Sequence, residues 1–206
     1  GVGGGGGARA APVGEGLVPL KLADGVAPEQ LHFGELGYYR EARPSYEDFL
    51  RARGAGHIPA GVRFQVSLPT PLAVVMPFCR QPDAQQIVPA YERAMLREVE
   101  RICAAIPHRD LAIQWDVCIE MVQWDGRMPT RPPFPGMEHV FAGNFQRLGA
   151  IVPADVELGF HLCYGDLDGK HFIDPADATK MVELANLIAR SVSRPLTWLH
   201  VPVPID

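Results

Sequence analysis

The segment "VELGFHLCYGD", residues Val156–Asp166, contains an apolar run of strand length that is bordered by a glycine. Side chains alternate between two faces along a β-strand. The apolar face carries Phe160, Leu162 and Tyr164, and the opposite face carries Gly159, His161 and Cys163. One strand therefore places a histidine and a cysteine on the same side, two residues apart, where both can reach one ion.

Three further runs have strand character: "VRFQVSL" (62–68), "LAIQWDV" (111–117) and "LTWLHV" (196–201). Helical patterns accompany them: an apolar stripe over 87–106, a helix capped by Asp174 with Pro175 at its first position, and a shorter helix from Ser45 to Gly54. Strands that alternate with helices pair in parallel, because each crossover returns the chain to the same end of the sheet. We therefore expect an α/β protein.

Each predicted strand has one more apolar and one more polar face. The polar faces hold Gln65 and Ser67, Gln114 and Asp116, His161 and Cys163, and Trp198 and His200. An open doubly wound sheet is apolar on both faces, whereas the strands of a barrel enzyme carry functional side chains at their C-terminal ends. The pattern predicts a (β/α)8 TIM barrel. Because such a barrel has eight strands and we find four, we expect it to be incomplete in this chain, with further strands after Asp206.

Composition narrows the classes of partner. The 206 residues carry a formal net charge of -5 and no cluster of Lys or Arg, which argues against nucleic-acid or membrane binding. There is no apolar run of membrane-spanning length and no secretory signal, so a cytoplasmic protein is expected. The four cysteines (Cys79, Cys103, Cys118 and Cys163) are widely spaced, which favours free thiols or a metal site over disulfides. The Gly-rich residues 1–30 predict a flexible leader before a domain at 31–206.

The candidate site combines three metal ligands with a carboxylate. His200 falls at the same depth as His161 on the next predicted strand, so that His161, Cys163 and His200 are together predicted to bind zinc. A fourth ligand is expected beyond Asp206. Zinc with a free position lowers the pKa of a bound thiol, which favours a thiol substrate. Asp116, as the catalytic carboxylate, is a candidate to bind a substrate ammonium group, although it can also pair with an arginine or cap a loop. Gln114 and Ser67, on the same polar face, are candidate substrate-binding residues.

Several motifs, in order, resemble the catalytic barrel of cobalamin-independent methionine synthase and its superfamily, which includes uroporphyrinogen decarboxylase. "VSLPTPLAVV" (66–75) resembles that family's Leu-Thr-Gly-Pro strand and loop, and "EVERICAAIPHRDLAIQWDVCIE" (98–120) resembles its helix and Ile-Gln-Ile-Asp-Glu-Pro strand. "FHLCYGD" (160–166) resembles its His-x-Cys-Tyr zinc strand. The resemblance spans about Arg63 to His200 and is closer to uncharacterised relatives than to the synthase.

The resemblance implies that His161 and Cys163 bind zinc and that Asp116 holds the amino group of a thiol such as homocysteine. Two departures bear on the chemistry. The family's zinc-binding glutamate is replaced by His200, and its Glu-Pro after the strand aspartate is replaced by Val117 and Cys118. A histidine in place of a carboxylate removes one negative charge from the site and alters the activation of a thiolate.

Three functional hypotheses follow. The first is a zinc-dependent methyltransferase, or more broadly an alkyl transferase, that moves a group from a one-carbon donor to a small-molecule thiol. The second is a metal-free decarboxylase or lyase of the same superfamily, with Asp116 as the charged group. The third is a catalytically inactive barrel that binds a metabolite, because a fold does not determine a function.

Overall fold

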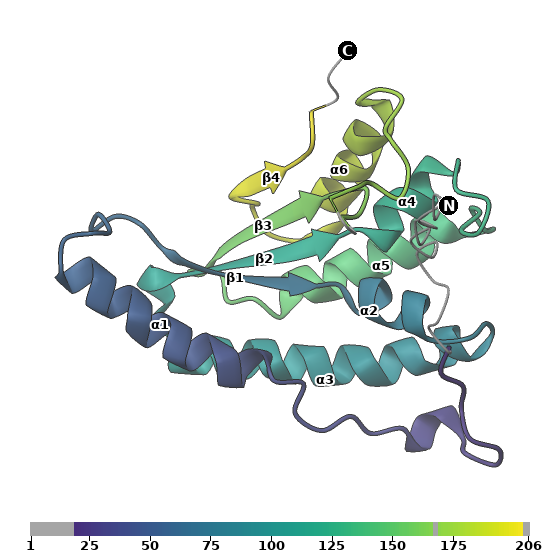
Figure 1. Ribbon diagram of the computed structural model, residues 1–206, viewed down its shortest axis with the longest axis horizontal. Helices are drawn as coiled ribbons and strands as arrows, with labels where there is room; N and C mark the ends of the chain where they lie inside the picture. The colour runs from purple at the N-terminus through teal and green to yellow at the C-terminus, as the bar shows by residue number, and fades with distance from the viewer. Residues whose placement is uncertain (1–18, 167–168, 204–206) are drawn as a thin grey trace, which may run out of the picture.

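The computed structural model describes residues 19–166 and 169–203. Four parallel strands form one sheet in the order β1-β2-β3-β4 (Figure 1). They are β1 (Phe64–Pro69), β2 (Leu111–Val117), β3 (Glu157–Leu162) and β4 (Trp198–His200). Each strand pairs with the strand that precedes it in the chain. Because the pairs are parallel, each connection returns the chain to the same end of the sheet before the next strand begins. The predicted α/β class and parallel pairing are confirmed.

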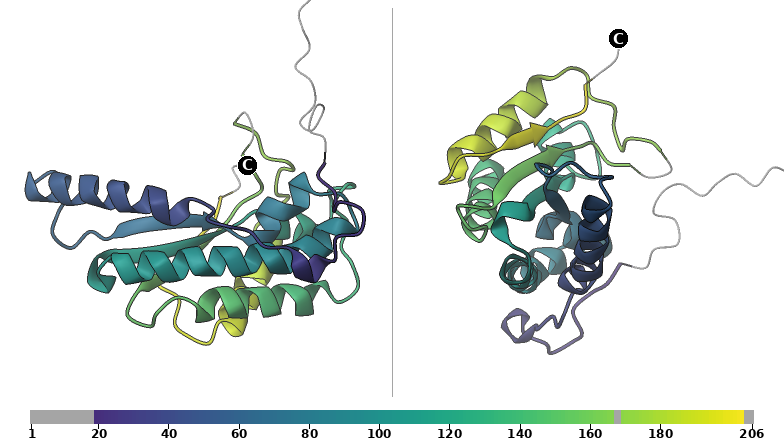
Figure 2. Two further views of the ribbon diagram at one scale, coloured as in Figure 1. Left: turned by 90° about the horizontal axis from the view of Figure 1, so that it is seen from below. Right: turned by 90° about the vertical axis from the view of Figure 1, so that its left-hand side faces the viewer.

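The connections are mostly helical. The helices are α1 (Tyr38–Gly54), α2 (Pro71–Phe78), α3 (Asp83–Ala105), α4 (Ile119–Asp125), α5 (Met137–Ala150) and α6 (Thr179–Ser191), with two short 3-10 helices, η1 (Pro28–Gln30) and η2 (His108–Asp110). Figure 2 shows α3 and α5 side by side along one face of the sheet, and α6 packs against α5. The other face of the sheet carries the polar side chains of the predicted site, among them Asp116 and His161.

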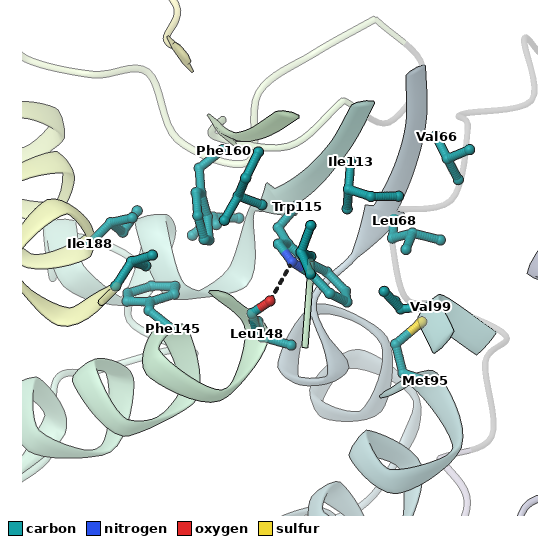
Figure 3. Packing of buried hydrophobic residues seen from close by; sticks show 14 of the residues in the cluster. Val66, Leu68, Met95, Val99, Ile113, Trp115, Phe145, Leu148, Phe160 and Ile188 are labelled. Carbon is teal, nitrogen blue, oxygen red and sulfur yellow. Dashed lines mark hydrogen bonds between the residues drawn. The ribbon is translucent and has the colours of Figure 1, made fainter. Parts of the chain in front are cut away.

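The core lies between the sheet and these helices (Figure 3). Its strand side chains are those predicted for the apolar face, among them Leu68, Ile113, Trp115 and Phe160, all fully buried. The helices contribute Met95 and Val99 of α3, Phe145 and Leu148 of α5, and Ile188 of α6. The indole Nε1 of Trp115 donates a hydrogen bond to the carbonyl oxygen of Leu148 at 3.1 Å, which satisfies the ring's one polar group. Full burial of each such side chain contributes about 1.5 to 3 kcal/mol.

Two helix boundaries differ from the prediction. The last helix begins at Thr179 and not at Asp174, because the chain before it turns instead: the Asp177 carboxylate accepts the Thr179 backbone N–H at 2.7 Å, and the N-cap residue Ala178 makes no side-chain cap. The first helix ends at Gly54 as predicted but begins at Tyr38 and not at Ser45. Its early start depends on a distant residue: the buried Glu98 carboxylate of α3 accepts the backbone N–H of Tyr39 at 2.7 Å. A contact between residues so far apart in the sequence cannot be predicted from the local pattern around Tyr38.

The predicted leader, 1–30, is described only from residue 19 onward, and residues 1–18 lie outside the described part. Leu20 is held beside the end of α2, where its N–H donates to Phe78 and its carbonyl accepts from Arg80, both at 2.8 Å. Within residues 19–166 and 169–203 the sheet has four strands and does not close, so the TIM barrel stays a prediction. No helix in this same part of the chain is long and apolar enough to cross a membrane.

Candidate functional site

The strand register aligns the polar side chains in two rows across the sheet. The first row consists of Ser67, Gln114, Gly159 and Trp198, and the second of Pro69, Asp116, His161 and His200. The second row lies nearer the C-terminal ends of the strands. His200 is therefore the direct neighbour of His161, as its predicted depth requires, and Asp116 is the neighbour on the other side.

The first row forms a floor below the site. The indole of Trp198 lies across Gly159, so closely that a Cβ atom at residue 159 would be 2.0 Å from the ring. Its Nε1 donates to Gln114 Oε1 at 3.0 Å, and Gln114 Nε2 donates to Asp116 Oδ1 at 2.9 Å. Gln114 is buried and both ends of its amide bind protein groups. In the structure Gln114 thus holds the Asp116 carboxylate, and substrate binding by Gln114 stays a prediction.

Ser67, the other predicted substrate-binding residue, is exposed on the edge strand β1. Its hydroxyl oxygen accepts from Gln65 Nε2 at 2.9 Å and lies 3.4 Å from Gln114 Nε2. Ser67 therefore lies on the same face as the predicted site but in the row below Asp116.

Asp116 and His161 form a carboxylate and imidazole pair. Asp116 Oδ1 lies 3.4 Å from His161 Nδ1, and the hydrogen bond to Asp116 is the main reason that the pKa of His161 is raised. With Nδ1 directed at the carboxylate, the ring presents Nε2 away from it. This is the arrangement in which a histidine binds a metal through Nε2 while a carboxylate holds the other nitrogen.

The ring of His200 is stacked on that of His161, with centroids 4.4 Å apart and planes inclined by 19°. Stacked imidazoles direct their nitrogens side by side and not toward a common point. In the described part of the chain, no three His, Cys, Asp or Glu side chains are placed to hold a metal ion together. The structure thus brings the predicted ligands next to one another without arranging them around one point.

Cys163 follows His161 by two residues, on the same side of the chain. The Cys118 thiol donates a hydrogen bond to the Cys163 sulfur, which is the main cause of the lowered pKa of Cys163 and raises that of Cys118. The backbone N–H of Gly165 and the positive charge of His161 act in the same direction on Cys163. Of these two thiols Cys163 is therefore the more acidic, and the thiolate is the form that binds metals.

These side chains open into a pocket of about 340 Å³ lined by His161, Cys163 and His200 together with Lys170, His171 and Pro202. The loop after β3 forms one wall, because the Phe172 N–H donates to the Tyr164 carbonyl at 2.8 Å and folds the loop back. Lys170 brings a positive charge to this wall. The sequence patterns did not indicate Lys170, since it lies in a loop without periodicity.

Glu120 is a second residue that the sequence analysis missed. It lies in the first turn of α4, is 1% exposed, and neither carboxylate oxygen has a hydrogen-bond partner in the described residues. Burial raises its pKa to about 7, although the nearby Thr70 hydroxyl and the Glu120 backbone partly oppose the shift, and the charge of Cys163 adds to it. A lone acid within the apolar run "CIEMV" is the sequence signal that would have found it.

No protein-family model matches the chain, and no curated protein or solved structure is significantly similar to it. The arrangement of the site itself is thus the basis for any assignment of function.

Proposed function

We propose that this protein is a (β/α)8-barrel transferase that uses zinc to move a methyl or alkyl group from a one-carbon donor to a small-molecule thiol. The observation that carries the proposal is the grouping of His161, Cys163 and His200 at one pocket, with Asp116 against the far nitrogen of His161. Imidazole and thiolate groups are the ligands that zinc prefers. When bound, zinc would lower the pKa of a substrate thiol so that it reacts as a thiolate.

The residues of the chain have separate tasks in this proposal. Asp116, held by Gln114, keeps the proton of His161 on Nδ1 and leaves Nε2 free to bind. Cys163 provides a thiolate at neutral pH. His200 is exposed and has to turn off the ring of His161 for its nitrogen to join the other two. The pocket wall carries both Asp166 and Lys170, of which Lys170 can pair with the carboxylate of an amino-acid thiol.

Zinc content tests the proposal directly. After equilibration with zinc and removal of the free metal, we expect about one zinc per chain by elemental analysis. The double variant His161→Ala/Cys163→Ser is expected to retain almost none. The variant His57→Ala/Cys79→Ser makes the same two changes outside the pocket and is expected to bind zinc as the wild type does. Equal zinc in the wild type and the first variant would contradict the proposal, and the single variant Cys163→Ser repeats the test if the double variant does not fold.

The carboxylate behind His161 makes a second prediction. Asp116→Asn removes the charge that orients His161, and we expect the zinc dissociation constant to rise about 10- to 100-fold, as for other groups that hold a metal ligand. The matched control is Asp155→Asn, because Asp155 makes the same contact with His108 Nδ1, at 2.8 Å, outside the pocket. Competition with a chromophoric chelator measures both. An unchanged dissociation constant in Asp116→Asn would show that Asp116 does not support the metal.

A further inference from the structure

The two cysteines at the ends of β2 and β3 are direct neighbours across the sheet. Val117 pairs with Leu162 in the parallel register, and the N–H of Cys163 donates to the Val117 carbonyl at 3.1 Å. Cys118 directly follows Val117 at the end of β2, and Cys163 directly follows Leu162 at the end of β3. Cys163 lines the pocket together with His161, and Cys118 is the N-cap residue of α4, directly after β2.

This placement suits a covalent bond between the two sulfurs. Neighbouring strands in a sheet lie about 4.8 Å apart, and the Cα atoms of disulfide-bonded cysteines are usually about 4.4 to 6.8 Å apart. The two side chains lie close enough for each to be the main influence on the pKa of the other. The remaining cysteines lie on other elements: Cys103 is buried in α3, and Cys79 caps the end of α2.

The pair is also accessible to a small reagent. Cys163 lines the 340 Å³ pocket, and both cysteines are partly exposed and carry free thiols. A molecule of the size of hydrogen peroxide can therefore reach the Cys163 sulfur without unfolding of the sheet.

We propose that Cys118 and Cys163 are a redox modification site that hydroperoxides convert into a reversible disulfide. In the first step the Cys163 sulfur attacks one peroxide oxygen, the O–O bond breaks, and the products are a sulfenic acid on Cys163 and a molecule of water or alcohol. In the second step the Cys118 sulfur attacks the Cys163 sulfur, the S–O bond breaks and a second water leaves. The two thiols lose two hydrogens and two electrons in total, which the peroxide takes up.

The disulfide would withdraw Cys163 from any metal, because a sulfur bonded to another sulfur is no longer a thiolate ligand. Oxidation would thus inactivate the pocket, and a dithiol reductant would restore it by exchange. The inference does not require the proposed function, since the metal-free protein contains the same pair.

The test uses the full chain, treated with a chelator and then with hydrogen peroxide. We expect the number of free thiols to fall from four to two per chain and to return to four after treatment with dithiothreitol. A tryptic digest under non-reducing conditions is expected to link peptide 110–127, which contains Cys118, to peptide 148–170, which contains Cys163. Zinc added before the peroxide is expected to slow the linkage.

Two variants give the controls. Cys79→Ser/Cys103→Ser retains the pair and is expected to form the same linked peptides, with free thiols falling from two to none. Cys118→Ser is expected to form no link and to accumulate sulfenic and sulfinic acid on Cys163; Cys118→Ala replaces it if the serine disturbs folding. Over-oxidised Cys163 without any link in the wild type, or a link between two chains, would overturn the inference. A linked wild type that binds no zinc would contradict the proposed function and leave this inference standing.

Discussion

Gly159→Ala is expected to destabilise the protein by about 2 to 3 kcal/mol and to displace the last strand, β4, from the sheet. The added methyl group would lie 2.0 Å from Cε2 of Trp198 and 2.3 Å from Cδ2, which no rotation of the glycine backbone relieves while the indole stays in place. The indole has to leave, and it then loses its packing and its hydrogen bond to Gln114. β4 has only three residues and pairs only with β3 among the described strands, so beside this pairing and the hydrogen bonds between Thr197 and Leu158 the indole is its main attachment.

The measurement is denaturant unfolding together with tryptophan fluorescence. We expect a lower midpoint of unfolding and a shift of the native emission to longer wavelength, because the Trp198 indole becomes exposed. The matched control is Gly143→Ala in α5, where an added Cβ would be 3.4 Å from the flexible end of Arg147 and where alanine favours the helix. An unfolding midpoint in Gly159→Ala equal to that of the wild type would mean that the indole does not lie on residue 159 in solution.

The same displacement has a consequence for the pocket. His200 lies two residues after Trp198 on the same face of β4, and the pairing of this strand with β3, to which Trp198 contributes, places it beside His161. Gly159→Ala should therefore weaken zinc binding without a change in any of the proposed ligands. Because Gly159 has no Cβ, it leaves the space that the Trp198 indole occupies, and so it affects whether β4 can place His200 at the site.

The sequence predicts those features of this arrangement that depend on residues close together in the chain, such as the position of a strand. β2 was predicted at the residues where it occurs, 111–117, because its apolar run has the length and composition of a strand. The pairing of His161 with His200 followed from counting residues along two strands, which requires no knowledge of side-chain angles. The stacking of their rings depends on rotamers, which only the neighbouring side chains determine.

Other parts of the site were missed because the element that carries them was missed. α4 has seven residues, too few to show a helical period, and it follows β2 directly. Cys118 therefore received no role beyond that of one of four widely spaced cysteines, although it directly follows Val117, whose partner Leu162 is directly followed by Cys163. For the same reason Glu120 received no interpretation, since its burial depends on elements that lie far from it in the sequence.

Glu120→Gln is expected to reduce the loss of stability that the wild-type protein suffers as the pH rises. In the folded chain the pKa of Glu120 is about 7, against an ordinary value of 4.5. Between these values the folded state holds a proton that the unfolded state has released, so the free energy of unfolding falls with rising pH. A difference of this size corresponds to about 3 kcal/mol, fully present below pH 4.5 and lost as the pH passes through 7.

Urea unfolding at several values between pH 4.5 and pH 8 measures the effect. The free energy of unfolding of Glu120→Gln relative to the wild type is expected to rise by about 3 kcal/mol across this range, because glutamine carries no charge at any pH. Glu100→Gln, on the exposed face of α3, is the matched control and should give a profile parallel to that of the wild type. Parallel profiles for Glu120→Gln and the wild type would show that the carboxyl is hydrated or paired.

The direction of this effect also bears on Cys163, whose charge acts on Glu120. A carboxyl that is neutral below pH 7 beside Cys163 does not repel the thiolate, whereas the ionised form does, and this repulsion is one of the causes that raise the pKa of Glu120. Ionisation of Glu120 and a negative charge on Cys163 are therefore mutually unfavourable. Any cation bound at Cys163 would relieve that repulsion, so zinc should reduce the difference between the pH profiles of the wild type and Glu120→Gln, while the deprotonation of His161 and Cys163 that zinc binding requires adds the same pH dependence to both.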